Sequence, residues 1–212
     1  MRIQPANCKK ILSVIGLPHS GTTIVSNIFN SMDNTYCLSE PHWILLSKPT
    51  ALTFDKIATL EYNSINDLLP AIKRHLSNNK QFNYGGVKET YRPLGTVKKY
   101  LDLTIQISDI IVFTLRNPLA LYNSFKKIST SPMPISRLEH DYHMLIKEID
   151  NCKNPHFTLI LEQLCAAGDK GAIQYINQQA HGILKIVGDF KLNPTNYKYG
   201  NHIANKSKQI NK

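Results

Sequence analysis

Long hydrophobic runs are absent from this chain of 212 residues. A membrane-spanning helix needs about 20 consecutive apolar residues, and no stretch of the sequence approaches that length. The amino-terminal segment MRIQPANCKK is too polar for a secretory signal, and the apolar stretch behind it is short. We therefore expect no membrane span and a cytoplasmic location.

Cysteine is scarce, and its spacing matches neither a disulfide framework nor a zinc site. None of the four cysteines belongs to a CxxC pair, and the sequence shows no zinc-finger pattern. We therefore expect buried free thiols and a site without a metal. The cysteines are Cys8, Cys37, Cys152 and Cys165.

Nucleic-acid-binding signatures are also missing, although the chain is basic. Its formal net charge of +10 indicates an anionic partner, such as an acidic glycan or a phosphorylated cofactor. The basic residues are scattered except for a lysine-rich end, and no RNA-recognition or helix-turn-helix pattern occurs. Nucleic acid is therefore not a predicted partner. The charge alone selects no ligand.

Strand and helix patterns alternate along the whole chain. Short apolar, β-branched runs predict strands at residues 10–17, 36–38, 84–88, 109–115 and 157–161. Helical periodicity predicts helices at residues 24–32, 66–77, 97–107, 118–127, 139–149 and 170–184. No linker divides them, so we expect a single domain, residues 1–212. The alternation predicts a three-layer α/β/α fold on a central parallel sheet.

A glycine-containing loop follows the first predicted strand, but it lacks one expected lysine. Gly16 and Gly21 have the spacing of a P-loop, GxxxxGK[ST], in which Thr22 replaces the lysine. Backbone N–H groups at a helix start bind anions, so the loop predicts a phosphate site with little capacity for ATP hydrolysis. The alternative is a tight turn in which Ser20 or Thr22 caps the helix.

The loop resembles the phosphosulfate-binding loop of sulfotransferases that use PAPS (phosphoadenosine phosphosulfate). Those loops commonly read Pro-[Lys/Arg]-Ser-Gly-Thr-[Thr/Ser], and this chain departs from them in its histidine. The resemblance implies a P-loop nucleotide-hydrolase-like fold and PAPS as donor, with PAP as product. It also implies donor binding by Pro18, His19, Ser20, Gly21, Thr22 and Thr23.

A second motif stands where the sulfotransferase family binds the extra ribose phosphate of the donor. The segment IIVFTLRNPLALYNSFKK places Arg116 at the end of a predicted strand and Ser124 two helical turns later. Arginine offers a planar, permanently charged fork of donors to a phosphate. Near the carboxyl terminus, the Gly-Asn segment ending at Asn201 resembles one that closes over the donor, so that Lys206 or Lys208 could reach a phosphate; a solvated basic tail explains these residues equally well.

Three residues are candidates for the chemistry. Glu40, in the run Leu-Ser-Glu-Pro, is the leading general base, because carbohydrate and tyrosylprotein sulfotransferases place a glutamate at a comparable distance past the loop. The alternative is an ordinary glutamate before proline in an exposed turn. His19 is the rival base or an acid toward the leaving phosphate. Lys88 can supply the charge that His19 lacks, or it is an ordinary strand-end lysine.

The resemblance thus predicts sulfuryl transfer from PAPS to a hydroxyl, with a carbohydrate acceptor favoured. Two alternatives remain at this stage: a kinase-like phosphotransferase, and a non-catalytic protein of the same fold that binds PAP or another anion. The sequence identifies neither the acceptor nor the oligomeric state.

Overall fold

The computed structural model describes residues 1–4, 9–41, 52–54, 57–60, 65–92, 96–128 and 133–188. Its centre is a five-stranded sheet whose paired strands all run parallel. The strands of this sheet are β2 (Lys10–Gly16), β3 (Thr35–Ser39), β6 (Tyr84–Thr90), β7 (Ile110–Leu115) and β8 (His156–Ile160). The helices are α1 (Thr22–Asn30), α3 (Leu68–Asn78) after a short 3₁₀ turn (Ile65–Asp67), α4 (Thr96–Ile107), α5 (Pro118–Ile128), α6 (Ile135–Asn151) and α7 (Leu161–Gln179).

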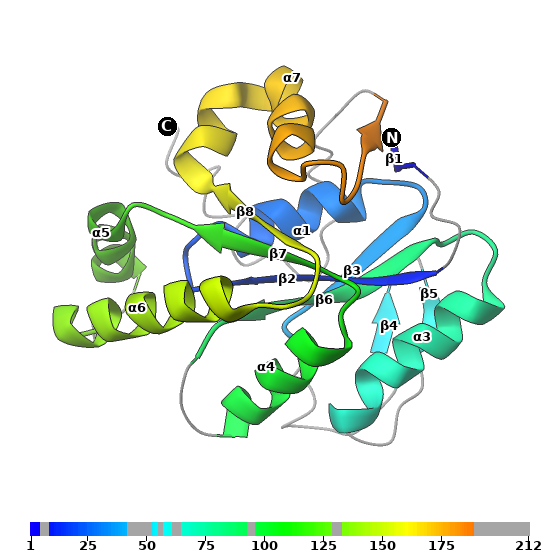
Figure 1. The fold of residues 1–212 in the computed structure, drawn as a ribbon, viewed down its shortest axis with the longest axis horizontal. Helices are drawn as coiled ribbons and strands as arrows, with labels where there is room; N and C mark the ends of the chain where they lie inside the picture. The colour runs from blue at the N-terminus through cyan, green and yellow to red at the C-terminus, as the bar shows by residue number, and fades with distance from the viewer. Residues whose placement is uncertain are drawn as a thin grey trace.

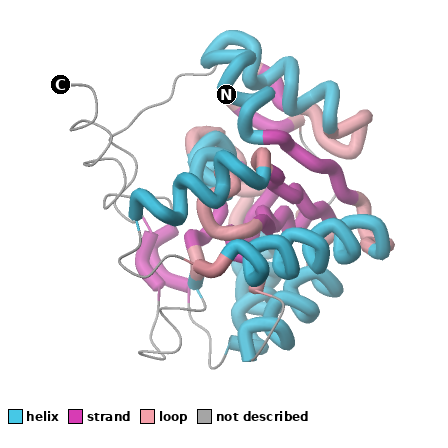
Figure 2. The backbone as a smooth tube through the Cα atoms, turned by 90° about the vertical axis from the view of Figure 1, so that its left-hand side faces the viewer, coloured by secondary structure: helices cyan, strands magenta, loops and turns pink. Residues whose placement is uncertain are grey.

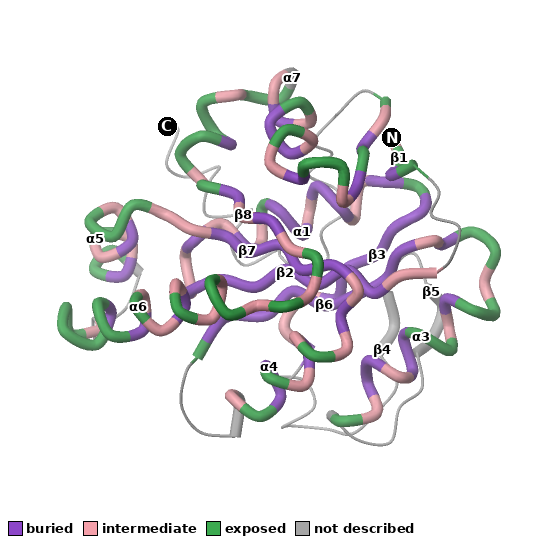
Figure 3. Tube along the Cα trace, viewed as in Figure 1, coloured by how far each residue is buried: buried purple, intermediate pink, exposed green. Residues whose placement is uncertain are grey.

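The sheet is covered on both faces, as the expected three-layer α/β/α fold requires. Helices α1 and α7 lie on one side, and α3, α4 and α6 lie on the other (Figure 1). Figure 2 shows the same layers from the side. The strands are buried and the outward helix faces are exposed (Figure 3). The continuous apolar run of β2 reflects this double cover, because a parallel strand inside three layers has no solvent face.

The strand order is β3-β6-β2-β7-β8, which puts the loop-bearing strand β2 at the centre. The chain leaves β2 through α1 toward β3, but it leaves β7 through α5 and α6 toward β8 on the opposite side. A pair of neighbouring strands whose connections diverge in this way is a topological switch point. Ligands of open α/β sheets bind beyond the carboxyl ends of such strands. The carboxyl ends of β2 and β7 are therefore the first place to look for a site.

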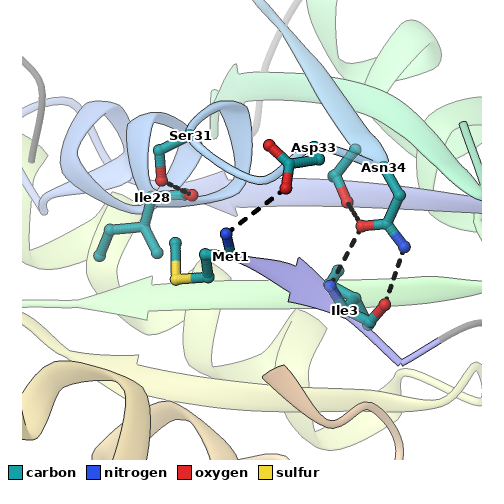
Figure 4. A network of polar contacts seen from close by, with 7 residues as sticks. Met1, Ile3, Ile28, Ser31, Asp33 and Asn34 are labelled. Atoms are coloured by element: carbon teal, nitrogen blue, oxygen red, sulfur yellow. Dashed lines mark hydrogen bonds and ion pairs between the residues drawn. The ribbon is translucent and has the colours of Figure 1, made fainter. Parts of the chain in front are cut away.

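Two short antiparallel pairs lie outside the central sheet. They are β1 (Arg2–Ile3) with β9 (Ile186–Val187), and β4 (Leu52–Phe54) with β5 (Ile57–Leu60). A polar network fixes the first pair: the Asn34 amide bonds both backbone groups of Ile3, and the Met1 ammonium lies 3.5 Å from Asp33 (Figure 4). Two-residue strands are too short to give a periodic pattern, so the sequence did not predict this pair.

Most of the predicted elements are found within a few residues of their expected limits, but the last helix is an exception. It was expected over residues 170–184, whereas α7 spans Leu161–Gln179. Gly168, with a φ of 62°, divides it by a kink, so its first two turns do not continue the periodicity of the rest. Left-handed backbone at His181 and Gly182 ends it early.

Candidate functional site

Residues 18–23, called the anion loop below, follow β2 at the switch point and include the first two residues of α1. The loop closes tightly, because the Ser20 amide donates to the Leu17 carbonyl at 3.0 Å. His19 has a φ of 68° and Gly21 a φ of 97°. At Gly16, a Cβ atom would lie 2.1 Å from Thr114 Oγ1, so only glycine allows the strand end to approach β7 this closely.

The start of α1 has no side-chain cap. Gly21 occupies the N-cap position, and no side-chain hydrogen bond is made there. The alternative in which Ser20 or Thr22 caps the helix is therefore wrong. Ser20 Oγ instead bonds Thr114 Oγ1 at 2.7 Å, which pins the anion loop to β7. The first N–H groups of a helix have no intrahelical partner, so those of α1 are left for a ligand.

The end of β7 places Arg116 against the anion loop. Its Nη1 donates to the His19 carbonyl oxygen at 3.0 Å, across 97 residues of sequence. The next residue, Asn117, caps α5: its side-chain oxygen accepts from the Leu119 and Ala120 amides. The sequence prediction that Arg116 follows the strand and that a helix begins at Pro118 is confirmed. A guanidinium and a group of helix-start amides thus meet at one edge of the sheet.

Glu40, which follows β3, forms an ion pair with Lys88 of the neighbouring strand β6. Lys88 Nζ donates to Glu40 Oε1 at 2.6 Å, and the Glu40 amide donates to the Lys88 carbonyl at 2.7 Å. The lysine side chain is 4% exposed, whereas the glutamate side chain is 30% exposed. The pair therefore holds the Glu40 carboxylate just after the end of β3, where solvent reaches it.

The electrostatics connect the two halves of the site through His19. Burial lowers the pKa of His19 below 6.5, and the nearby Arg116 charge lowers it further, whereas Glu40 raises it. The imidazole also packs edge-on against Phe125 of α5, with ring centres 4.6 Å apart. At neutral pH the loop histidine is therefore uncharged, and Arg116 is the cation that contacts the anion loop.

Backbone strain coincides with the predicted chemistry. Outside glycine, the described residues with positive φ are His19 (68°), Glu40 (47°) and His181 (45°). His181 follows the carboxyl end of α7, where a left-handed residue is a common helix stop. The other two have no helix end to explain them. Strained non-glycine backbone at two candidate catalytic residues is typical of functional sites.

Some of the remaining predicted residues lie near the anion loop, and others lie outside the described residues. Ser124 is half-buried on α5, next to the Phe125 that contacts His19. Thr22 and Thr23 begin α1, and Thr22 is buried. Asn201 and Lys206 lie outside the described residues. The predicted roles of these two therefore stay predictions.

The structure also brings to the site residues that the sequence did not single out for it. Thr114 bonds the anion loop, and Glu162 bonds the turn after β7. Thr90 pairs in register with Gly16, and its buried hydroxyl makes no hydrogen bond within the described part of the chain. Strand patterns predicted that Thr90 and Thr114 lie near strand ends. Local periodicity does not give the strand order, so it could not predict that both threonines lie beside the end of β2.

Comparison with known proteins adds no family to this picture. No protein-family model matches the chain, and no curated protein matches it. Within the described ranges, no group of three or more His, Cys, Asp or Glu side chains is arranged to hold a metal ion. None of the described helices combines the length and apolar character needed to cross a bilayer.

Proposed function

We propose that this protein is a PAPS-dependent sulfotransferase of a P-loop-like fold that transfers a sulfuryl group to a hydroxyl acceptor. One observation carries the proposal: Arg116 donates to the His19 carbonyl at 3.0 Å, at a switch point where the start of α1 has no side-chain cap. The Arg116 guanidinium and the amides at the start of α1 are therefore two distinct candidate anion-binding groups at the same end of the sheet. A donor with a phosphosulfate and a second phosphate matches such a pair of elements.

The anion loop suits the phosphosulfate end of this donor. Backbone amides and the positive end of the α1 dipole bind an anion without a lysine. The adjacent Arg116 fork suits the extra ribose phosphate, since guanidinium binds phosphate through two parallel hydrogen bonds. Ser124 follows two turns along α5 and is the further candidate donor to that phosphate. The sequence resemblance predicts the same residues for these two groups, and the geometry supports that prediction.

Sulfuryl transfer needs a base on the acceptor side, and Glu40 is suited to it. The acceptor oxygen attacks sulfur while the bond from sulfur to the phosphate oxygen breaks. The acceptor proton passes to the carboxylate, and PAP leaves with the bond electrons. Lys88 holds the carboxylate in place, and 30% of the Glu40 side chain reaches solvent. Positioning and charge neutralisation provide most of the catalysis in such a transfer.

Thermal unfolding with candidate nucleotides tests the proposal. PAP should raise the melting temperature, and ATP with Mg²⁺ should not, because a ligand stabilises the state that binds it. Arg116→Ala should sharply reduce the PAP shift, whereas Lys147→Ala, an exposed lysine on α6, should leave it intact. A shift with ATP and Mg²⁺ alone would favour the phosphotransferase and refute the sulfotransferase.

Transfer is measured separately with labelled PAPS and a panel of hydroxyl acceptors. Glu40→Gln keeps the size of the side chain and should bind PAP as the native protein does, but it should transfer no sulfate. Undiminished transfer by this variant would move the base to His19. PAP binding without transfer to any acceptor would indicate the non-catalytic alternative.

A further inference from the structure

Glu162, the second residue of α7, contacts the turn that follows β7. Its Oε1 accepts a hydrogen bond from the Asn117 amide at 3.1 Å. The same oxygen lies 3.8 Å from Arg116 Nε. One carboxylate oxygen therefore faces both the guanidinium and the backbone that carries it, although 45 residues separate Glu162 from Asn117.

The Arg116 guanidinium is held from two sides. Nη1 donates to the His19 carbonyl at 3.0 Å, and Nε is buried toward Glu162. Nε makes no hydrogen bond within the described part of the chain, so its contact with Glu162 is ionic. A planar group constrained at Nη1 and at Nε has its orientation fixed. The side chain is still 27% exposed, so other N–H groups can meet a ligand.

The start of α7 is itself fixed relative to the anion loop. Leu161 packs so closely on Gly21 that a Cβ there would lie 2.7 Å from Leu161 Cδ1. Leu161 thus contacts the anion loop while Glu162 contacts the turn after β7. The backbone that carries Glu162 is therefore fixed near Arg116, and the Asn117 amide holds its carboxylate. Its effect is to hold the guanidinium rather than to occupy the place of the ligand.

We propose that Glu162 is a positioning residue that orients Arg116 toward the second phosphate of the nucleotide. This inference rests on the proposed function, which assigns that phosphate to Arg116. Its consequence is specificity: Glu162 sets the preference for a nucleotide with a 3′-phosphate over one without it. Preorganisation of this kind raises affinity because the guanidinium need not be ordered on binding.

The test compares PAP with AMP, which lacks the 3′-phosphate, by calorimetric titration. The native protein should bind PAP more tightly. Glu162→Gln should weaken PAP binding about fivefold, because it removes the charge that orients Arg116 and a partly exposed ion pair contributes on that scale, and it should change AMP binding less than about twofold. Glu139→Gln, an exposed glutamate on α6, is the matched control and should change neither.

A double-mutant cycle separates orientation from a general structural effect. In an Arg116→Ala background, Glu162→Gln should weaken PAP binding no further, because its effect acts through Arg116. Equal losses for PAP and AMP, tighter PAP binding, or additive losses in the cycle would each overturn the role of Glu162. A native protein that does not prefer PAP over AMP would overturn both this inference and the proposed function.

Discussion

The Glu40–Lys88 pair should show a strong asymmetry when its partners are removed one at a time. Lys88 is almost fully buried and Glu40 is 30% exposed. Removing the glutamate leaves a buried ammonium without its counter-charge, whereas removing the lysine leaves a carboxylate that water still reaches. Unfolding free energies should therefore differ between two variants that break the same 2.6 Å contact.

The magnitudes follow from burial. Breaking a buried pair so that one charge stays uncompensated costs about 3 kcal/mol, which we expect for Glu40→Ala. Alanine at φ 47° is as strained as glutamate there, so the backbone term cancels. Lys88→Met keeps the apolar stem and leaves a half-solvated carboxylate, so we expect about 1 kcal/mol. The double variant has no charge to bury, and its loss should also be about 1 kcal/mol.

Urea unfolding monitored by circular dichroism measures these free energies of unfolding. Unchanged m-values would show that the unfolded state is comparable among the variants. The predicted coupling is about 3 kcal/mol, well above the additivity error of about 0.5 kcal/mol. Losses that simply add in the double variant would refute the idea that the pair is energetically coupled. Equal losses in the two single variants would refute the argument from burial.

Two further predictions concern the anion loop. Gly16→Ala should destabilise the protein by about 3 kcal/mol, because the new Cβ would lie 2.1 Å from Thr114 Oγ1 and 2.7 Å from the Thr114 carbonyl oxygen. Gly171→Ala, whose Cβ would meet only the Ala167 methyl at 3.1 Å, is the control and should be close to neutral in the same urea assay; similar losses would contradict the steric argument. Because the folded pKa of His19 is lowered, stability present above pH 6.5 should be lost as the pH falls through the folded pKa. Asparagine tolerates the left-handed backbone at this position, so His19→Asn should lose less stability than the native protein between pH 7.5 and 5.5. An identical loss would show that His19 does not cause the pH dependence of stability.

Local patterns predicted most of the elements that surround the site. The apolar runs of β2 and β7 have no polar alternation, which marked them as buried parallel strands. Proline at residue 118 predicted where α5 begins, because such a start depends on neighbouring residues alone. The predicted start of α7, at residue 170, was wrong. Leu161 and Leu164 continue an apolar run that a strand or a helix can explain equally well.

The candidate site could be predicted only in part. Resemblance to sulfotransferase motifs selected His19, Glu40, Lys88 and Arg116. The first, second and fourth follow the carboxyl ends of β2, β3 and β7, and Lys88 of β6 contacts Glu40. Their mutual contacts could not be predicted, because each joins residues that are far apart in the chain. Glu40 and Lys88 are 48 residues apart, and Ser20 and Thr114 are 94 apart. Contacts at that separation depend on strand order rather than on local preference.

By itself the sequence determined a buried strand, a glycine turn and the helix that follows, because these depend on periodicity and on the backbone freedom of Gly21. The structure showed that this helix start has no side-chain cap. Only the tertiary structure decided that β2 lies between β6 and β7. That order sets Arg116 against the anion loop and the Glu40–Lys88 pair on the other side of it. The physical reason is that sheet packing, which buries apolar faces from distant segments, chooses which strand ends become neighbours.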